Sequence, residues 1–156
     1  MESFPLSEIK KELQNLQPKQ MQELLLRLAK FKKENKELLS YLLFDAADEE
    51  HFIENCKNEI NIQFRQINRS SHLYVKKSLR KGLKITNQYI KFSGSSKVEI
   101  ELLLYFCKKM RDSGFGRSSH PVIWNIYLRQ VQRIQKVLKT MHEDLQFDYE
   151  EAIENL

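Results

Sequence analysis

Seven lysine and arginine residues lie in the stretch 74–97, which contains no carboxylate. Clustered cations of this kind neutralise the phosphates or carboxylates of a partner and need no covalent chemistry to do so. On a helix, six of them would fall within about 140° of arc and extend for roughly 22 Å. The stretch therefore predicts one basic stripe, made by Lys76, Lys77, Arg80, Lys81, Lys84 and Lys91.

A second group of cations follows in the helix that His120 and Pro121 are expected to open. Arg129, Arg133, Lys136 and Lys139 lie opposite the apolar residues of that helix. If the two helices are neighbours, they present a surface for an acidic macromolecule, either nucleic acid or protein. We predict the contacts Lys76, Lys77, Arg80, Lys81, Lys84, Lys91, Arg129 and Arg133.

The charges are segregated along the chain. Residues 60–142 hold 17 basic and 3 acidic side chains, residues 1–59 hold 9 and 12, and residues 143–156 hold none and 6. Other interpretations stay open. In the first, the lysines form a purely solvated surface, and in the second they face a membrane. In the third, the acidic C-terminal segment folds back and pairs with them.

The segment SGFGRSSHP, residues 113–121, carries the ingredients of an anion site directly before a helix. Glycines expose backbone amides, and Arg117, Ser118 and Ser119 add a guanidinium and two hydroxyls. The spacing is not that of a Walker motif. The simpler interpretation is that Ser119 caps the following helix.

Two pairs of carboxylates have the spacing used for metal-dependent hydrolysis. Glu34-x-x-Glu37 is followed by Asp45-x-x-Asp48. The pattern is similar to the ExxE and ExxD pairs of the all-α, magnesium-dependent nucleotide pyrophosphohydrolases, and the resemblance implies metal-dependent hydrolysis as an alternative function. In that family the pairs face each other on two helices, whereas here they fall on what looks like one continuous helix, about 16 Å apart.

No other segment has a recognisable catalytic motif. The four histidines lack HExxH spacing, and neither a serine elbow nor a Cys–His motif is present. We therefore expect a non-enzymatic binding or scaffold protein without metal or cofactor, for which a small-molecule substrate is not expected. Another alternative is a scaffold that binds a peptide along an apolar groove.

Apolar spacing of three and four residues predicts that helices position these side chains. With only 4 glycines and 3 prolines, the chain has few residues for the turns of an antiparallel sheet. We expect an all-α fold of seven or eight helices, built as HEAT- or armadillo-like stacked helical hairpins or as an irregular bundle. Residues 18–46 form one bent helix or two.

The length of 156 residues predicts a single domain spanning residues 1–156. Cys56 and Cys107 lie in apolar helical patterns and are expected to be reduced core residues. The charged N-terminus and the absence of a long apolar run predict a cytoplasmic protein with no membrane span.

Overall fold

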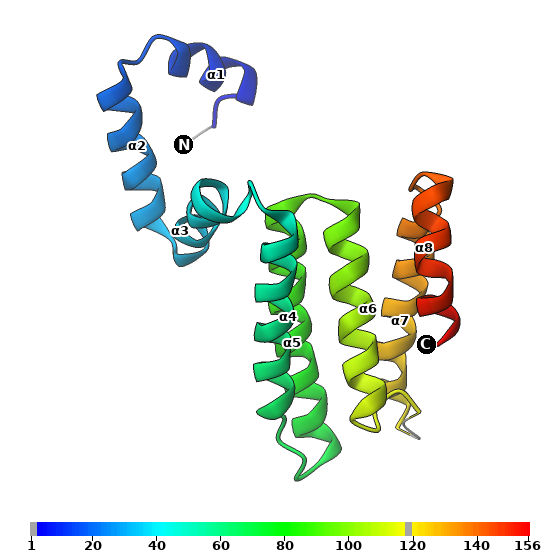
Figure 1. Ribbon diagram of the computed structural model, residues 1–156. Coiled ribbons are helices and arrows are strands. Elements are labelled where there is room, and N and C mark those ends of the chain that lie inside the picture. The colour runs from blue at the N-terminus through cyan, green and yellow to red at the C-terminus, as the bar shows by residue number, and fades with distance from the viewer. Residues whose placement is uncertain (1–2, 118–119) are drawn as a thin grey trace. The chain divides into compact units, whose positions relative to one another are not determined.

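The computed structural model describes residues 3–117 and 120–156. These residues form eight α-helices and one short π-helix, with no strand among them, so the predicted all-α fold of seven or eight helices is confirmed. The chain divides into two compact units, residues 1–45 and 46–156, each described by itself below (Figure 1). The single domain expected from the length stays a prediction.

The N-terminal unit consists of α1 (Leu6–Gln14), α2 (Pro18–Phe31), α3 (Lys33–Ser40) and the π-helix η1 (Tyr41–Asp45). Pro18 opens α2 because its ring fixes a helical φ and its missing N–H is not needed there. Lys32 is extended, with φ −141° and ψ 146°, and it separates α2 from α3. Residues 18–46 are therefore not one helix.

Asn35 connects α3 to α2. Lys32 occupies the N-cap of α3. The side-chain amide of Asn35 donates to the backbone carbonyl of Leu28 at 2.9 Å. This bond ties α3 back to the end of α2. None of the residues described in this unit is buried, so its amphipathic helices keep their apolar sides accessible.

The C-terminal unit contains α4 (Glu49–Arg65), α5 (His72–Ser93), α6 (Ser96–Asp112), α7 (Pro121–Leu138) and α8 (Glu143–Glu154). Helices α5 and α7 form one layer, behind α4, α6 and α8 in the view of Figure 1. The contacts agree with this arrangement, since α6 contacts α4, α5 and α7, and α5 contacts α7. Successive helices thus alternate between two layers.

Local sequence signals set the ends of these helices. Asp48 caps α4 by accepting from the His51 amide at 3.0 Å, and Ser71 caps α5 in the same way. Gly94 ends α5 with a left-handed φ of 63°, which glycine adopts without a Cβ clash. Ser95 then caps α6 by accepting from the Val98 amide.

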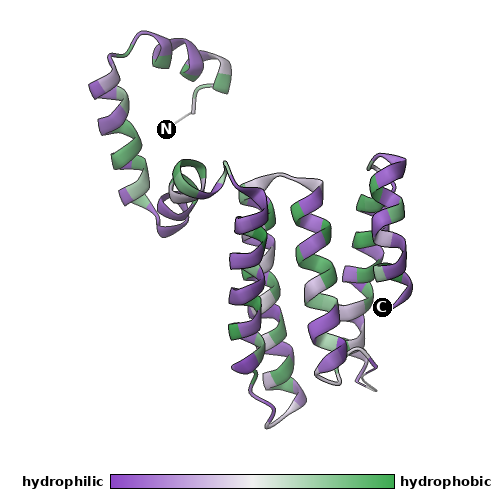
Figure 2. Ribbon diagram, viewed as in Figure 1, coloured by the Kyte–Doolittle hydropathy of each residue, from purple (hydrophilic) through white to green (hydrophobic). Residues whose placement is uncertain are grey.

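Helix α6 is the centre of the hydrophobic core. Seven of its side chains are buried, in agreement with its apolar residues at every angle: Val98, Ile100, Leu102, Leu103, Phe106, Cys107 and Met110. Phe106 meets Phe64 of α4 edge to face at 5.1 Å between ring centroids. Polar residues occupy most of the visible side of α4, away from this core (Figure 2).

None of the helices within the described residues is long and apolar enough to cross a membrane.

Cys56 and Cys107 are buried and form no disulfide, so their predicted place in the core is confirmed. Burial raises the pKa of the Cys107 thiol to about 12, because the thiolate loses hydration there. Only the thiolate is nucleophilic. The folded protein should therefore protect this residue from thiol reagents.

We expect both cysteines to react with a disulfide reagent such as DTNB only after unfolding. At about pH 8 an exposed thiol is partly ionised and reacts within minutes, whereas buried thiols should react at the rate of opening of the fold. The absorbance of released thiolate, followed with and without urea, measures this. Rapid reaction of the native protein would contradict the buried positions.

Two glycines should respond in opposite ways to alanine. A Cβ at Gly82, inside α5, would meet its nearest neighbours at 3.5 and 3.6 Å, which is ordinary contact. Gly82→Ala should raise the free energy of unfolding by about 0.5–1 kcal/mol through helix propensity. A Cβ at Gly116 would lie 2.9 Å from the Arg111 Cα, which is closer than normal contact. Gly116→Ala should therefore lower the free energy of unfolding. Urea unfolding measures both changes, and equal signs would contradict this packing.

Candidate interface for an acidic partner

The buried side of α5 determines where its cations point. Val75, Leu79, Gly82, Thr86 and Ile90 face the core. At about 100° per residue, the centre of the basic stripe lies roughly 150° around the helix from this buried line. The stripe is therefore directed away from the core.

The predicted stripe is open to solvent over most of its length. Lys77, Arg80, Lys81, Lys84 and Lys91 are exposed, and Lys76 is half-buried. Within the ranges 3–117 and 120–156, none of the six forms an ion pair or a side-chain hydrogen bond. The structure thus brings these six predicted contacts together on one side of one helix.

Arg133 of α7 has a different environment from its neighbour Arg129. Arg129 is exposed, as are Lys136 and Lys139. The guanidinium of Arg133 pairs with Glu99 of α6, with 2.6 Å between Nε and Oε1. Its Nη1 donates to the Asn87 side chain of α5 at 2.5 Å. Arg133 therefore joins three helices, and Arg129 and Lys136 are the cations of α7 directed outward.

The two layers carry opposite charges. Helices α5 and α7 hold nine lysines and arginines and no carboxylate. Helices α4, α6 and α8 hold thirteen carboxylates and six lysines and arginines. Below, the "basic face" means the stripe of α5 together with Arg129 and Lys136 of α7. Because α5 and α7 are in contact, these residues belong to one layer.

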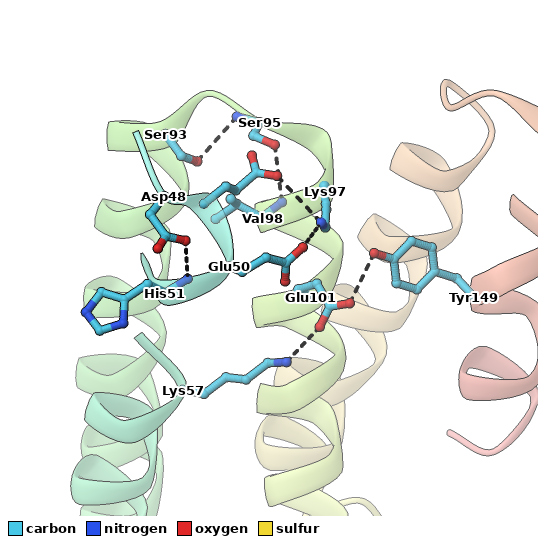
Figure 3. Close-up of polar contacts among 11 residues, drawn as sticks. Asp48, Glu50, His51, Lys57, Ser93, Ser95, Lys97, Val98, Glu101 and Tyr149 are labelled. Carbon is cyan, nitrogen blue, oxygen red and sulfur yellow. Dashed lines mark hydrogen bonds and ion pairs between the residues drawn. The ribbon is translucent and has the colours of Figure 1, made fainter. Parts of the chain in front are cut away.

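Several carboxylates of the other layer are engaged within that layer. Figure 3 shows Glu101 of α6 between Lys57 of α4, at 2.7 Å, and the hydroxyl of Tyr149 of α8, at 3.1 Å. Burial raises the pKa of the Tyr149 hydroxyl, and the Glu101 charge adds to the increase. The hydroxyl is thus a stable donor at neutral pH.

Lys97 makes a second set of pairs in that layer. It contacts Glu50, and its Nζ lies 3.9 Å from Glu49 (Figure 3). The hydrogen bond that Lys97 donates to the Glu50 carboxylate raises the pKa of Lys97. These carboxylates are therefore matched by cations that do not belong to the basic face.

The acidic helix α8 is held away from the stripe of α5. It packs against α7. The backbone carbonyl of Leu156, just after α8, accepts a hydrogen bond from the Tyr127 hydroxyl of α7. The Tyr149 hydroxyl of α8 donates to Glu101 of α6. All six of its carboxylates are exposed. None of them forms an ion pair with a lysine or arginine of the described chain. The alternative in which this segment covers the basic face is therefore not what the structure shows.

The other predicted sites receive less structural support. Arg117 is exposed, while Ser118 and Ser119 lie outside the described residues, and His120 occupies the N-cap of α7. Of the paired carboxylates, Glu37 is 3.2 Å from Lys33, and Asp48 caps α4. In the described parts of the chain, no group of three or more His, Cys, Asp or Glu residues is placed to hold a metal.

Comparisons of the chain with protein-family models, with curated proteins and with solved structures gave no match.

The environments of Arg133 and Arg129 predict different effects on stability. Arg133→Gln removes a half-buried pair and the bond to Asn87, so it should lower the free energy of unfolding by about 1 kcal/mol. Arg129→Gln changes an exposed side chain and should alter the free energy of unfolding by less than about 0.5 kcal/mol. Urea unfolding of the two single variants tests this, and equal effects would show that the pair with Glu99 contributes nothing.

Proposed function

We propose that the C-terminal unit binds nucleic acid through the sugar-phosphate backbone, with the basic face as the contact surface. One observation carries the proposal. The layer of α5 and α7 holds nine cations without a single carboxylate, and those directed outward have no partner in the described chain. The protein contributes no catalytic step to this function.

The dimensions favour a repeating polyanion over a single charged group. Lys76 and Lys91 are separated by about 22 Å along α5. A duplex carries one charge for about every 1.7 Å of its axis, so it can offer a phosphate to each side chain of the stripe. Long lysine side chains adjust to such a target without reading its bases. We therefore expect binding with little sequence preference.

The release of condensed counterions drives the interaction, and relief of repulsion between neighbouring cations of α5 adds to it. Like charges four residues apart, such as Lys77 with Lys81 and Arg80 with Lys84, destabilise an isolated helix by a few tenths of a kcal/mol per pair. A bound phosphate backbone removes this cost and releases its own counterions. The affinity should consequently fall steeply as salt is added.

Exposed aromatic and apolar side chains flank the beginning of the stripe. Tyr74 is 48% exposed and Leu73 is 62% exposed. Aromatic rings stack on unpaired bases at about 1–3 kcal/mol per base, which would add to phosphate contacts when the ligand is single-stranded. Single strands should therefore bind at least as well as duplexes of equal length.

The proposal predicts a specific loss when the centre of the stripe is neutralised. The triple variant Arg80→Gln, Lys81→Gln and Lys84→Gln should weaken duplex binding and reduce the slope of log K against log salt by about 2.7, at about 0.9 for each lost contact. Fluorescence anisotropy with a labelled oligonucleotide, from about 50 mM salt upward, measures both quantities.

The matched control is the triple variant Lys10→Gln, Lys11→Gln and Lys19→Gln. It removes the same charge from exposed positions of the N-terminal unit. We expect the control to keep most of the affinity and the original slope. If the two triples weaken binding equally, only net charge matters and the basic face is not the contact surface.

A further inference from the structure

The end of the C-terminal unit where α5 and α7 begin contains a cavity of about 710 Å³. Its walls come from residues 69–72 and Val75 around the start of α5, from Gly114, Phe115 and Arg117 after α6, and from Ile123 of α7. Residues that contribute polar atoms are Arg69, Ser70, Ser71, His72 and Arg117. Among the lining residues that the structure describes there is no carboxylate.

Arg69, which precedes α5, is held in place by contacts with residues that follow α6. Arg69 donates from Nη1 to the carbonyl of Ser113 at 3.3 Å, and its guanidinium lies 5.0 Å from the centroid of the Phe115 ring. Phe115 itself is held by a bond from its amide to the carbonyl of Met110 at 2.8 Å. One face of the Arg69 guanidinium is thus supported, and its other N–H groups remain for a ligand.

Two histidines connect the helix starts at this end. The rings of His72, the first residue of α5, and His120, the N-cap of α7, stack with centroids 4.7 Å apart. The positive ends of two helix dipoles therefore lie side by side, next to two guanidinium groups and two serine hydroxyls. Every one of these groups favours a bound anion.

We propose that this cavity binds a phosphomonoester. Two guanidinium groups form charge-assisted hydrogen bonds to phosphate oxygens, and the absence of a lining carboxylate leaves a dianion without repulsion. The stripe of α5 begins one turn beyond His72, with Lys76 and Lys77. The cavity and the start of the stripe therefore lie at the same end of α5, although Val75, which lines the cavity, is on the buried side of that helix. The terminal phosphate of a strand bound at this end is one source of such a phosphomonoester.

Only the source of the phosphate rests on the proposed nucleic-acid function. The chemistry of the cavity is independent of it, because inorganic phosphate presents the same oxygens as a strand end. The two sources can be separated experimentally with inorganic phosphate alone and with two oligonucleotides that differ in a 5′-phosphate or a 5′-hydroxyl.

Binding of inorganic phosphate is measured by calorimetry on the full chain and on the single variants Arg69→Gln and Arg117→Gln. Each variant should weaken phosphate binding about tenfold or more, since each removes charge-assisted hydrogen bonds. Lys139→Gln changes an exposed cation that follows the far end of α7 and lies outside the basic face. It is the control of equal charge and should change phosphate binding less than about twofold. Arg117 makes no structural bond among the described residues, so its variant keeps the test valid if Arg69→Gln fails to fold.

Saturable phosphate binding that both arginine variants weaken and Lys139→Gln does not would support the proposal. Tighter binding of the 5′-phosphorylated strand would identify a nucleic-acid end as the source, and equal binding of the two strands would identify free phosphate. The proposal would be overturned if phosphate binding were not saturable, or if all three variants lost the same affinity for phosphate. Phosphate binding without any oligonucleotide binding would overturn the proposed function and leave the cavity site standing.

Discussion

The burial of α6 between its neighbours is the constraint on which the C-terminal unit depends. Its apolar side chains point in every direction, so α4, α5 and α7 must each direct an apolar stripe toward it. The buried side of α5, which includes Val75, Leu79 and Ile90, faces this core, and the opposite side of α5 must therefore face solvent. The exposed positions of the basic stripe follow from the packing of α6, because a lysine cannot be buried there without a partner.

The separation of charge between the layers follows from the same packing. Glu99 and Glu101 lie on α6, and their partners Arg133 and Lys57 come from α7 and α4. These pairs satisfy carboxylates close to the core. They leave the layer of α5 and α7 without a local counterion along the stripe, and the exposed carboxylates of α8 sit on the other layer. The C-terminal unit thus keeps the cations of α5 and α7 on one of its two layers.

The sequence predicted the parts of this arrangement that depend on local chemistry. Ser71 and Gly94 mark the ends of α5 through cap chemistry, and the basic stripe could be located because helical periodicity places it opposite the apolar one. The sequence left open whether the chain breaks at Lys32, since lysine has no intrinsic preference for an extended conformation and neither glycine nor proline is near. Arg133 could not be distinguished from Arg129, because its pairing with Glu99 depends on how α6 and α7 pack.

The cavity at the start of α5 shows the same limit for the candidate site. Arg69 and Arg117 are far apart in the chain and lie in two different connections, so their proximity is a property of the fold. It arises because α5 and α7 run parallel in one layer and begin at the same end (Figure 1). Parallel helices add their dipoles, whereas antiparallel neighbours cancel them. Helices α4 and α6 run in the opposite direction and end here, so they offset part of the dipoles of α5 and α7. The preference of the cavity for an anion therefore depends mainly on the guanidinium groups of Arg69 and Arg117, which no local sequence signal brings together.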